Sequence, residues 1–311
     1  LVFSCRRLDY SIGLRIEKKT IPHVEVESLG SGKIKEFLAV YLIDREELVD
    51  ATYATLEAEK TREIYNSPFY LTLLVDVVRD GSAVPRGRAG LFSAFVRKAL
   101  QRELATNRLF ARTGPLLTAD DYDQALNADW ANDHDLPIDT ALFSGLASLA
   151  HGMQTHGAEA DLARRRVLRI KTDVARALLV SKAGGGALPD DLLKGAVDLH
   201  LLERDGRTRE VQFRHQLFQE YFAARKLAAD LADADLADAD VSAASIAQLV
   251  SQPWRVSDVR PSVEEELARL GVAERLPTLE PTGWEETVKL TVAYNNTMSK
   301  AKVMPNTHTM M

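Results

Sequence analysis

The most constraining feature of the sequence lies between residues 189 and 228, where the spacing of apolar residues changes from helical to strand-like and back. Leu199–Glu203 and Arg209–Phe213 read as two short strands around Asp205-Gly206, a dipeptide typical of hairpin turns. A helix is expected before this hairpin and another after His215, and two more are expected upstream, on residues 142–150 and 170–178. This order of helices and hairpin predicts a winged helix.

The residues ahead of this region read as mostly helical. Leu1–Ser4 and His23–Leu29 have strand-like patterns and are joined by a loop. Two strands make no stable sheet on their own, so we expect them to need partners that the sequence does not visibly contain. From Lys33 onward the apolar spacing becomes helical, with one helix that starts near Pro68 and an amphipathic helix on residues 91–104.

Length and composition describe an ordinary globular protein. At ~150 residues per domain, 311 residues allow about two domains. The 39 Lys and Arg against 45 Asp and Glu give a net charge of −6, which argues against a general affinity for nucleic acid or an anionic membrane. No segment approaches the ~20 uninterrupted apolar residues of a membrane helix. With one cysteine, Cys5, no internal disulfide can form, so a cytoplasmic location is expected.

Two residue patterns that could form a phosphate-binding loop or a zinc site match their motifs poorly. The Gly-Ser-Gly-Lys run at 30–33 resembles part of a phosphate loop, but Glu27 replaces the required first glycine and Ile34 replaces the final Ser or Thr. We therefore expect only a break between strand and helix there. His151 and His156 are five residues apart, outside the i,i+4 spacing of helical zinc ligands, so no metal site is expected.

Four segments of the chain resemble NACHT-type NTPases, the signal-transduction ATPases related to animal inflammasome receptors and bacterial antiphage proteins. Phe213–Ala224 (FRHQLFQEYFAA) resembles the signature that closes their winged helix. Phe3–Arg6 resembles their Thr-Ser-Arg sensor strand, and Asn66–Leu71 resembles their Asn-Pro-Leu-x-Leu helix start. Trp284–Glu286 resembles a Trp-x-Glu element found after the winged helix. These segments follow the order of the family and span most of residues 1–292.

The resemblance implies roles for three residues. Arg6 would sense the γ-phosphate of ATP, because a guanidinium donates several charge-assisted hydrogen bonds to phosphate oxygens. Pro68 would pack against the adenine ring. His215 would contact the β-phosphate of ADP and hold the inactive form closed. Each residue has a simpler alternative: a surface arginine, a helix-start proline and a histidine that caps the following helix.

The resemblance also implies a cofactor and partners. The complete protein would bind ATP or ADP with Mg²⁺, but the family's phosphate loop and Mg²⁺-binding strand precede the sensor strand, with which this sequence begins. We therefore expect no tight nucleotide binding, no catalytic residue and no ATP hydrolysis from these residues alone. The expected partners are a missing N-terminal nucleotide-binding and effector region, C-terminal sensor repeats, and further copies of the complete protein on activation.

The expected fold class is mainly α: edge strands of a truncated P-loop α/β domain, a helical domain, and a winged helix with a short β-hairpin. Residues 229–241 carry five Asp and no basic residue, which we interpret as a solvated helical extension or hinge. The Met-rich end suggests a truncated or frame-shifted terminus. The expected domains are a nucleotide-domain remnant at 1–30, a helical domain at 31–138, the winged helix at 139–228, a helical extension at 229–293 and an irregular tail at 294–311.

Two other functions stay open. A winged helix can belong to a DNA-binding transcriptional regulator, but residues 189–199, the usual reading helix, carry three Asp and one Lys, a poor match to phosphates. The basic cluster from Arg164 to Lys171 could meet nucleic acid or an acidic partner, although a solvated helix face is the more common explanation. The third class is an inert interaction module or remnant, with exposed strand edges at Leu1–Ser4.

Overall fold

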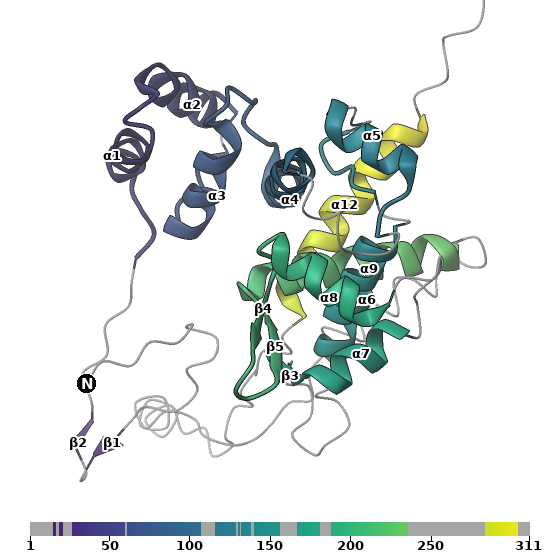
Figure 1. Ribbon diagram of the computed structural model, residues 1–311. Helices are drawn as coiled ribbons and strands as arrows, with labels where there is room; N and C mark the ends of the chain where they lie inside the picture. The colour runs from purple at the N-terminus through teal and green to yellow at the C-terminus, as the bar shows by residue number, and fades with distance from the viewer. Residues whose placement is uncertain are drawn as a thin grey trace, which may run out of the picture. The chain divides into compact units, whose positions relative to one another are not determined.

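The computed structural model (Figure 1) is mainly helical, as the sequence predicts. Contacts along the chain divide it into two compact units, Leu1–Thr72 and Leu73–Met311, which are described one at a time. In the part of the chain that is described, no helix is long and apolar enough to cross a membrane. The described residues are 15–16, 19–20, 27–59, 61–106, 116–128, 130, 132–137, 140–155, 167–180, 188–235 and 284–303.

The first unit consists of a short strand pair and helices. Its elements are β1 (Arg15–Ile16), β2 (Lys19–Thr20), α1 (Ser31–Tyr41), α2 (Glu46–Ala58) and the start of α3 (Pro68–Val78). β1 and β2 pair antiparallel. α1 and α2 pack together, and each buries one apolar face, with Ile34 and Leu38 on α1 and Leu56 on α2 fully buried. A helix was expected from Lys33 onward, after the glycine-rich run, but α1 begins within that run, at Ser31, with Gly30 as its N-cap.

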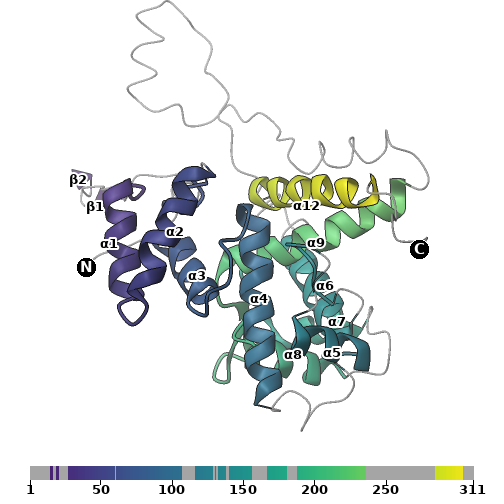
Figure 2. The same ribbon diagram turned by 90° about the horizontal axis from the view of Figure 1, so that it is seen from above.

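The second unit is organised around one long helix, α9. Its elements are the rest of α3, α4 (Gly87–Ala105), α5 (Ala119–Asn127), α6 (Ala141–Thr155), β3 (Arg169–Lys171), α7 (Thr172–Val180), α8 (Pro189–Asp198), β4 (Leu202–Asp205), β5 (Glu210–Phe213), α9 (Gln216–Asp235) and α12 (Glu285–Val303). α9 packs against both α6 and α12 (Figures 1 and 2).

The apolar face of α9 carries the aromatic core that the sequence predicts. Phe218, Tyr221 and Phe222 are each at most 3% exposed. The ring of Phe92 on α4 lies 5.4 Å from that of Phe218, and the ring of Phe143 on α6 lies 6.4 Å from that of Phe222. Burying such a side chain contributes about 1.5–3 kcal/mol, so this face fixes α9 between α4 and α6.

A three-stranded antiparallel sheet lies beside the helices, with the strand order β3-β5-β4. The hairpin predicted around Asp205-Gly206 is confirmed: β4 and β5 pair from Leu202–Phe213 to Asp205–Glu210. Side chains alternate along β5, with Val211 and Phe213 buried toward the helices and Glu210 and Gln212 on the outer face. The sheet therefore has one apolar face and one polar face.

Several expectations from the sequence need correction. A helix was expected across residues 170–178, but β3 occupies Arg169–Lys171, and α7 begins at Thr172. The tail at 294–311 was expected to be irregular, whereas α12 continues to Val303. β1 and β2 fall in the expected loop between the first two strand-like runs. The run Leu1–Ser4 and most of the run 23–29 lie outside the described residues.

Candidate functional site

His215 connects the end of β5 to the start of α9. Its side chain is half-buried, and its Nδ1 accepts a hydrogen bond from the backbone N–H of Leu217 at 3.2 Å. The imidazole therefore caps α9, which is the structural alternative that the sequence raised. An Nδ1 that accepts requires the proton of the neutral ring to be on Nε2, so Nε2 is a donor. A cap through Nδ1 is thus compatible with a hydrogen bond from Nε2 to a phosphate oxygen.

Pro68 is the first residue of α3, as predicted, and its ring is exposed. The carbonyl oxygen of Ser67 accepts the Leu71 N–H at 3.1 Å, so the helix starts normally around the proline. An exposed ring agrees with both a base contact and a helix-start role.

Arg6 lies outside the described residues, and Pro68 and His215 belong to different units. The described residues therefore contain no assembled site with all three.

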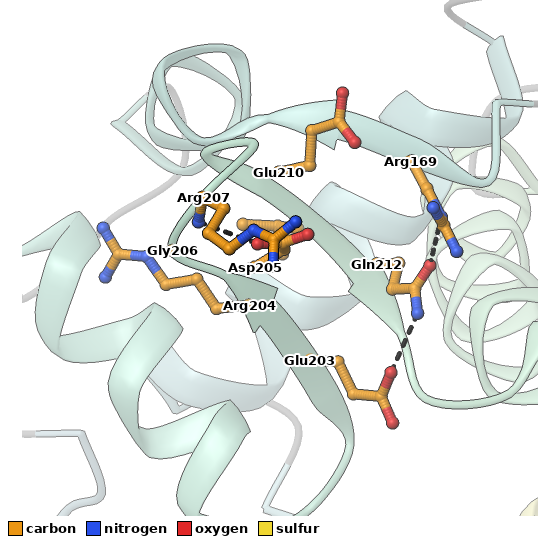
Figure 3. Close-up of a pocket in the computed structure, with 9 residues that line it drawn as sticks. Arg169, Glu203, Arg204, Asp205, Gly206, Arg207, Glu210 and Gln212 are labelled. Atoms are coloured by element: carbon orange, nitrogen blue, oxygen red, sulfur yellow. Dashed lines mark hydrogen bonds between the residues drawn. The ribbon is translucent and has the colours of Figure 1, made fainter.

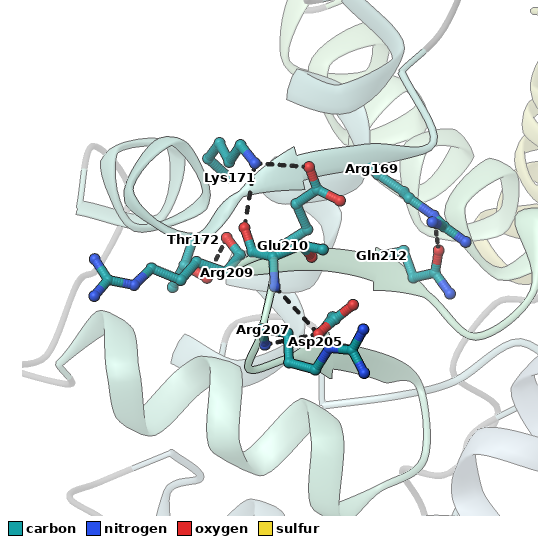
Figure 4. Close-up of polar contacts among 9 residues, drawn as sticks. Arg169, Lys171, Thr172, Asp205, Arg207, Arg209, Glu210 and Gln212 are labelled. Carbon is teal, nitrogen blue, oxygen red and sulfur yellow. Dashed lines mark hydrogen bonds and ion pairs between the residues drawn. The ribbon is translucent and has the colours of Figure 1, made fainter.

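The polar outer face of the sheet forms an open hollow of about 540 Å³ (Figure 3). Its side chains are joined across the strands. Arg169 on β3 donates to Gln212 Oε1 on β5 at 2.6 Å, and Gln212 Nε2 donates to Glu203 on β4 at 2.8 Å. Lys171 pairs with Glu210 at 2.8 Å (Figure 4). The charged and polar groups of these five side chains are paired with one another. They therefore do not form a preformed site for an anion.

The turn of the hairpin is held in one conformation. Asp205 accepts hydrogen bonds from the backbone N–H groups of Arg207 and Thr208 at 2.7 and 3.2 Å, and these bonds lower the pKa of its carboxyl group. Arg209 has a positive φ of 53°, and its carbonyl oxygen accepts both the N–H and the hydroxyl of Thr172, at 2.9 and 3.0 Å (Figure 4). The turn is therefore anchored to the start of α7.

Three exposed arginines extend from this anchored hairpin: Arg204, Arg207 and Arg209. None of them forms a side-chain hydrogen bond or ion pair with another described residue. Arg204 also lines a second hollow of about 460 Å³, whose opposite wall is α8. Asp190 and Asp191 lie in the first turn of that helix, Arg176 and Lys194 also line the hollow, and Asp190 pairs with Arg176 at 3.0 Å.

Sequence reasoning missed a buried polar cluster between α4, α9 and α12. Arg225 is 4% exposed, and its Nη1 donates to the Tyr221 hydroxyl at 2.9 Å and to the His134 carbonyl oxygen at 3.0 Å. The Tyr221 hydroxyl also lies 2.7 Å from Ser93 Oγ. The guanidinium carbon of Arg225 lies 5.1 Å from the ring centroid of Tyr294 on α12, a cation–π contact.

Within the described residues, no carboxylate forms an ion pair with the buried Arg225 or the half-buried Arg97 of this cluster. Arg225 Nη2 is buried without a hydrogen-bond partner. Arg97 donates to the carbonyl oxygens of Asn132 and Asp135 at 2.5 and 2.6 Å, and burial lowers its pKa. Burial also lowers the pKa of His134. Carbonyl groups and aromatic rings thus stabilise the guanidinium groups of Arg97 and Arg225. The cluster connects α4, α9 and α12. The spacing of Tyr221 and Arg225, one turn apart on α9, is the signal that could have indicated it.

Comparison with known proteins gives no identification: no protein-family model, curated protein or solved structure matches the chain. The resemblance to NACHT-type NTPases therefore depends on the residues of this chain alone. Among the described residues, no group of three or more His, Cys, Asp or Glu side chains could hold a metal ion. His151 instead contacts the ring of Trp284, with 5.5 Å between ring centroids.

Proposed function

We propose that this chain is part of a cytoplasmic, nucleotide-dependent signalling switch of the NACHT type. The element order α6-β3-α7-α8-β4-β5-α9 and the strand order β3-β5-β4 are those expected of a winged helix, which supports the proposal. The observation that carries it is the position of His215 at the junction of β5 and α9, where its Nδ1 caps the helix that follows.

In this switch, ADP bound to a nucleotide domain would be contacted by His215 through its β-phosphate. The closed form persists only while the nucleotide binds it better than the open form. A hydrogen bond to a charged group contributes about 1.5–3 kcal/mol, so losing this one contact would change the ratio of closed to open molecules by about 10- to 100-fold. Exchange of ADP for ATP would release the closed form and allow further copies to assemble.

The other residues of the switch would have supporting roles. Arg6 would contact the γ-phosphate and Pro68 the adenine ring. The phosphate loop and Mg²⁺ of such a protein would supply the hydrolysis, and no residue of this chain is assigned to that step. A Gly-x-x-x-x-Gly-Lys-Ser/Thr motif encoded in frame ahead of Leu1 would support this division of roles.

The decisive test separates the two roles of His215 in the protein that carries an upstream phosphate loop. Asn is a good N-cap residue, so His215→Asn should preserve the cap while its shorter side chain loses the phosphate contact. We expect this variant to keep wild-type thermal stability and to oligomerise or signal without a trigger. His215→Ala should also lose stability. If His215→Asn behaves as wild type in both assays, His215 is only a cap.

A second test uses the 311-residue chain alone. Without a phosphate loop, we expect calorimetry to detect no ADP binding at micromolar concentrations. Micromolar affinity would mean that the phosphate site lies within these residues and that the assignment of His215 is misplaced.

A winged-helix DNA-binding regulator is the second candidate, favoured by the exposed arginines of the hairpin. It predicts duplex binding that weakens with salt, with a negative slope of log K against log salt concentration. A gel shift at low salt tests it directly. The first turn of α8 does not favour it, because Asp190 is already paired with Arg176 and Asp191 would lie against the phosphates of a duplex that crossed α8 and the hairpin.

A further inference from the structure

Helix α1 has apolar side chains on two faces. One face is fully buried in the first unit, where α1 packs against α2 (Figure 2), and it holds Ile34 and Leu38. The second face lies about a third of a turn away and carries Phe37, Val40 and Tyr41, at the i, i+3 and i+4 spacing that places side chains next to one another. Val40 is 67% exposed and Tyr41 is 48% exposed. Since a surface helix usually has one apolar face, the second face indicates a further contact.

The exposed apolar residues continue past the end of the helix. Ile43, in the turn after α1, is 73% exposed. The other large apolar side chains that are exposed within the described residues occur one at a time along the chain: Leu126, Leu168, Leu188 and Val292. Single exposed apolar side chains are common on protein surfaces, whereas a cluster marks an interaction site. We call Phe37, Val40, Tyr41 and Ile43 the α1 patch.

The aromatic part of the α1 patch is ordered before any partner binds. The rings of Phe37 and Tyr41 stack, with 4.3 Å between their centroids and 19° between their planes. A partner would therefore immobilise few additional rotamers, which reduces the entropic cost of binding.

Opposite charges flank the α1 patch. Lys33 lies in the first turn of α1, and Asp44 lies in the turn after the helix. Lys33 forms an exposed ion pair with Glu36 at 2.7 Å, and its ammonium group has three donors, so it can also bind a second carboxylate. Asp44 is exposed and forms no ion pair with another described residue. An anionic membrane surface would need a surplus of basic residues around the patch, and these charges provide none.

The flanking charges match a second copy of the same surface. In the sequence, Lys33 and Asp44 lie symmetrically about the midpoint between Phe37 and Val40. A two-fold axis through this midpoint sets two α1 helices antiparallel, with Phe37 of each copy against Val40 of the other. The same axis brings Lys33 of each copy near Asp44 of the other. The surface is therefore self-complementary in both apolar contacts and charge.

We propose that the α1 patch binds the α1 patch of a second copy in this antiparallel arrangement. The patch has four side chains per copy, against about 20–30 residues on each side of a standard interface, so the dimer is weak and depends on concentration. The contact needs no nucleotide. This proposal goes beyond the nucleotide switch and does not depend on it.

Analytical ultracentrifugation of the 311-residue chain without nucleotide tests the dimer. Between ~10 and ~500 µM, we expect wild type to change from monomer towards dimer. Val40→Glu/Ile43→Glu places carboxylates in the patch at exposed positions, so this variant should keep its thermal stability and dimerise at least about tenfold more weakly. The control Leu126→Glu/Val292→Glu makes the same change in net charge at exposed apolar positions elsewhere and should dimerise as wild type.

Charge reversal tests the antiparallel arrangement. Lys33→Asp or Asp44→Lys places like charges opposite each other at both ends of the dimer, so each variant alone should dimerise at least about threefold more weakly. In a mixture, one variant supplies two carboxylates and the other two ammonium groups, so mixed dimers should form about as tightly as wild-type dimers. This recovery requires both variants to be folded, which separates a lost contact from a lost fold.

Four results would overturn the proposal. The first is a wild-type chain that stays monomeric over this concentration range. The second is a lower thermal stability of Val40→Glu/Ile43→Glu, which would show that the α1 patch is covered within a single chain. The third is dimerisation that the patch variant or the charge reversals leave unchanged, or a mixture that does not recover. The fourth is a chain that does not dimerise but sediments with phosphatidylserine vesicles through Val40 and Ile43, which would assign the patch to a lipid surface.

Discussion

At the scale of single residues, the Tyr221 hydroxyl is the group on which the buried cluster depends. It accepts from Arg225 and is hydrogen-bonded to Ser93. Tyr221→Phe keeps the ring but leaves one N–H of the buried Arg225 Nη1 without its acceptor, while the other still donates to the His134 carbonyl oxygen, so we expect it to lower the free energy of unfolding by about 1–3 kcal/mol. Urea denaturation measures this value.

Ser93→Ala is the matched comparison for this variant. It leaves Tyr221 as an acceptor for Arg225 and should cost less than Tyr221→Phe. The double variant should cost less than the sum of the two, because both remove the same hydrogen bond. A stability of Tyr221→Phe within a few tenths of a kcal/mol of wild type would show that Arg225 is satisfied in another way.

The sequence predicted some of these residues and not others for a physical reason. The burial of Phe218, Tyr221 and Phe222 follows from their helical spacing, which is local information. The role of Arg225 depends on Ser93 and His134, far away in the sequence, and no local pattern links them. His215 is intermediate: a cap could be predicted from its position before α9, whereas a phosphate contact depends on a neighbouring domain.

At the scale of elements, α6 approaches α7 closely because Gly152 has no side chain. A Cβ at this position would lie 2.8 Å from a terminal carbon of Leu178. Gly152→Val adds two further carbons at the same place, so we expect overpacking to lower stability by about 1–3 kcal/mol despite the better helix propensity of valine. Gly32→Ala on α1 meets nothing within 4 Å and should raise stability by about 0.5 kcal/mol. Thermal denaturation followed by circular dichroism compares the two, and a Gly152→Val variant as stable as wild type would contradict this close packing.

The hairpin and β3 show what element prediction can and cannot reach. β4 and β5 are neighbours in sequence, and Asp205-Gly206 marks their turn, so local rules suffice. β3 has three residues, and Ile170 is in a strand only because it pairs with Val211 on β5. The helical spacing of Ile170 with later residues indicated the wrong element, because tertiary pairing overrides local preference at such short lengths.

At the scale of the second unit, α12 brings together residues that are very distant in sequence. Arg88 on α4 pairs with Glu286, and Gln154 Nε2 on α6 donates to Thr287 Oγ1 at 3.0 Å. The sequence drew attention to Trp284–Glu286 only through a family resemblance. In the structure, Trp284 packs with Leu227 and Leu231 at the C-terminal half of α9. The start of α12 thus covers the apolar face of the C-terminal half of α9.

This arrangement makes Trp284 the main apolar contact between the start of α12 and α9. Trp284→Ala should lower the free energy of unfolding by about 3–5 kcal/mol and speed hydrogen exchange of the backbone amides around Leu227 and Leu231. Val292→Ala is the control, because Val292 lies on the same helix but is 46% exposed and should cost under about 0.5 kcal/mol. If both variants lose the same small amount of stability, α12 is not held on α9 by this contact, and the Thr291–Ala224 hydrogen bond and the Arg225–Tyr294 cation–π contact would hold it instead.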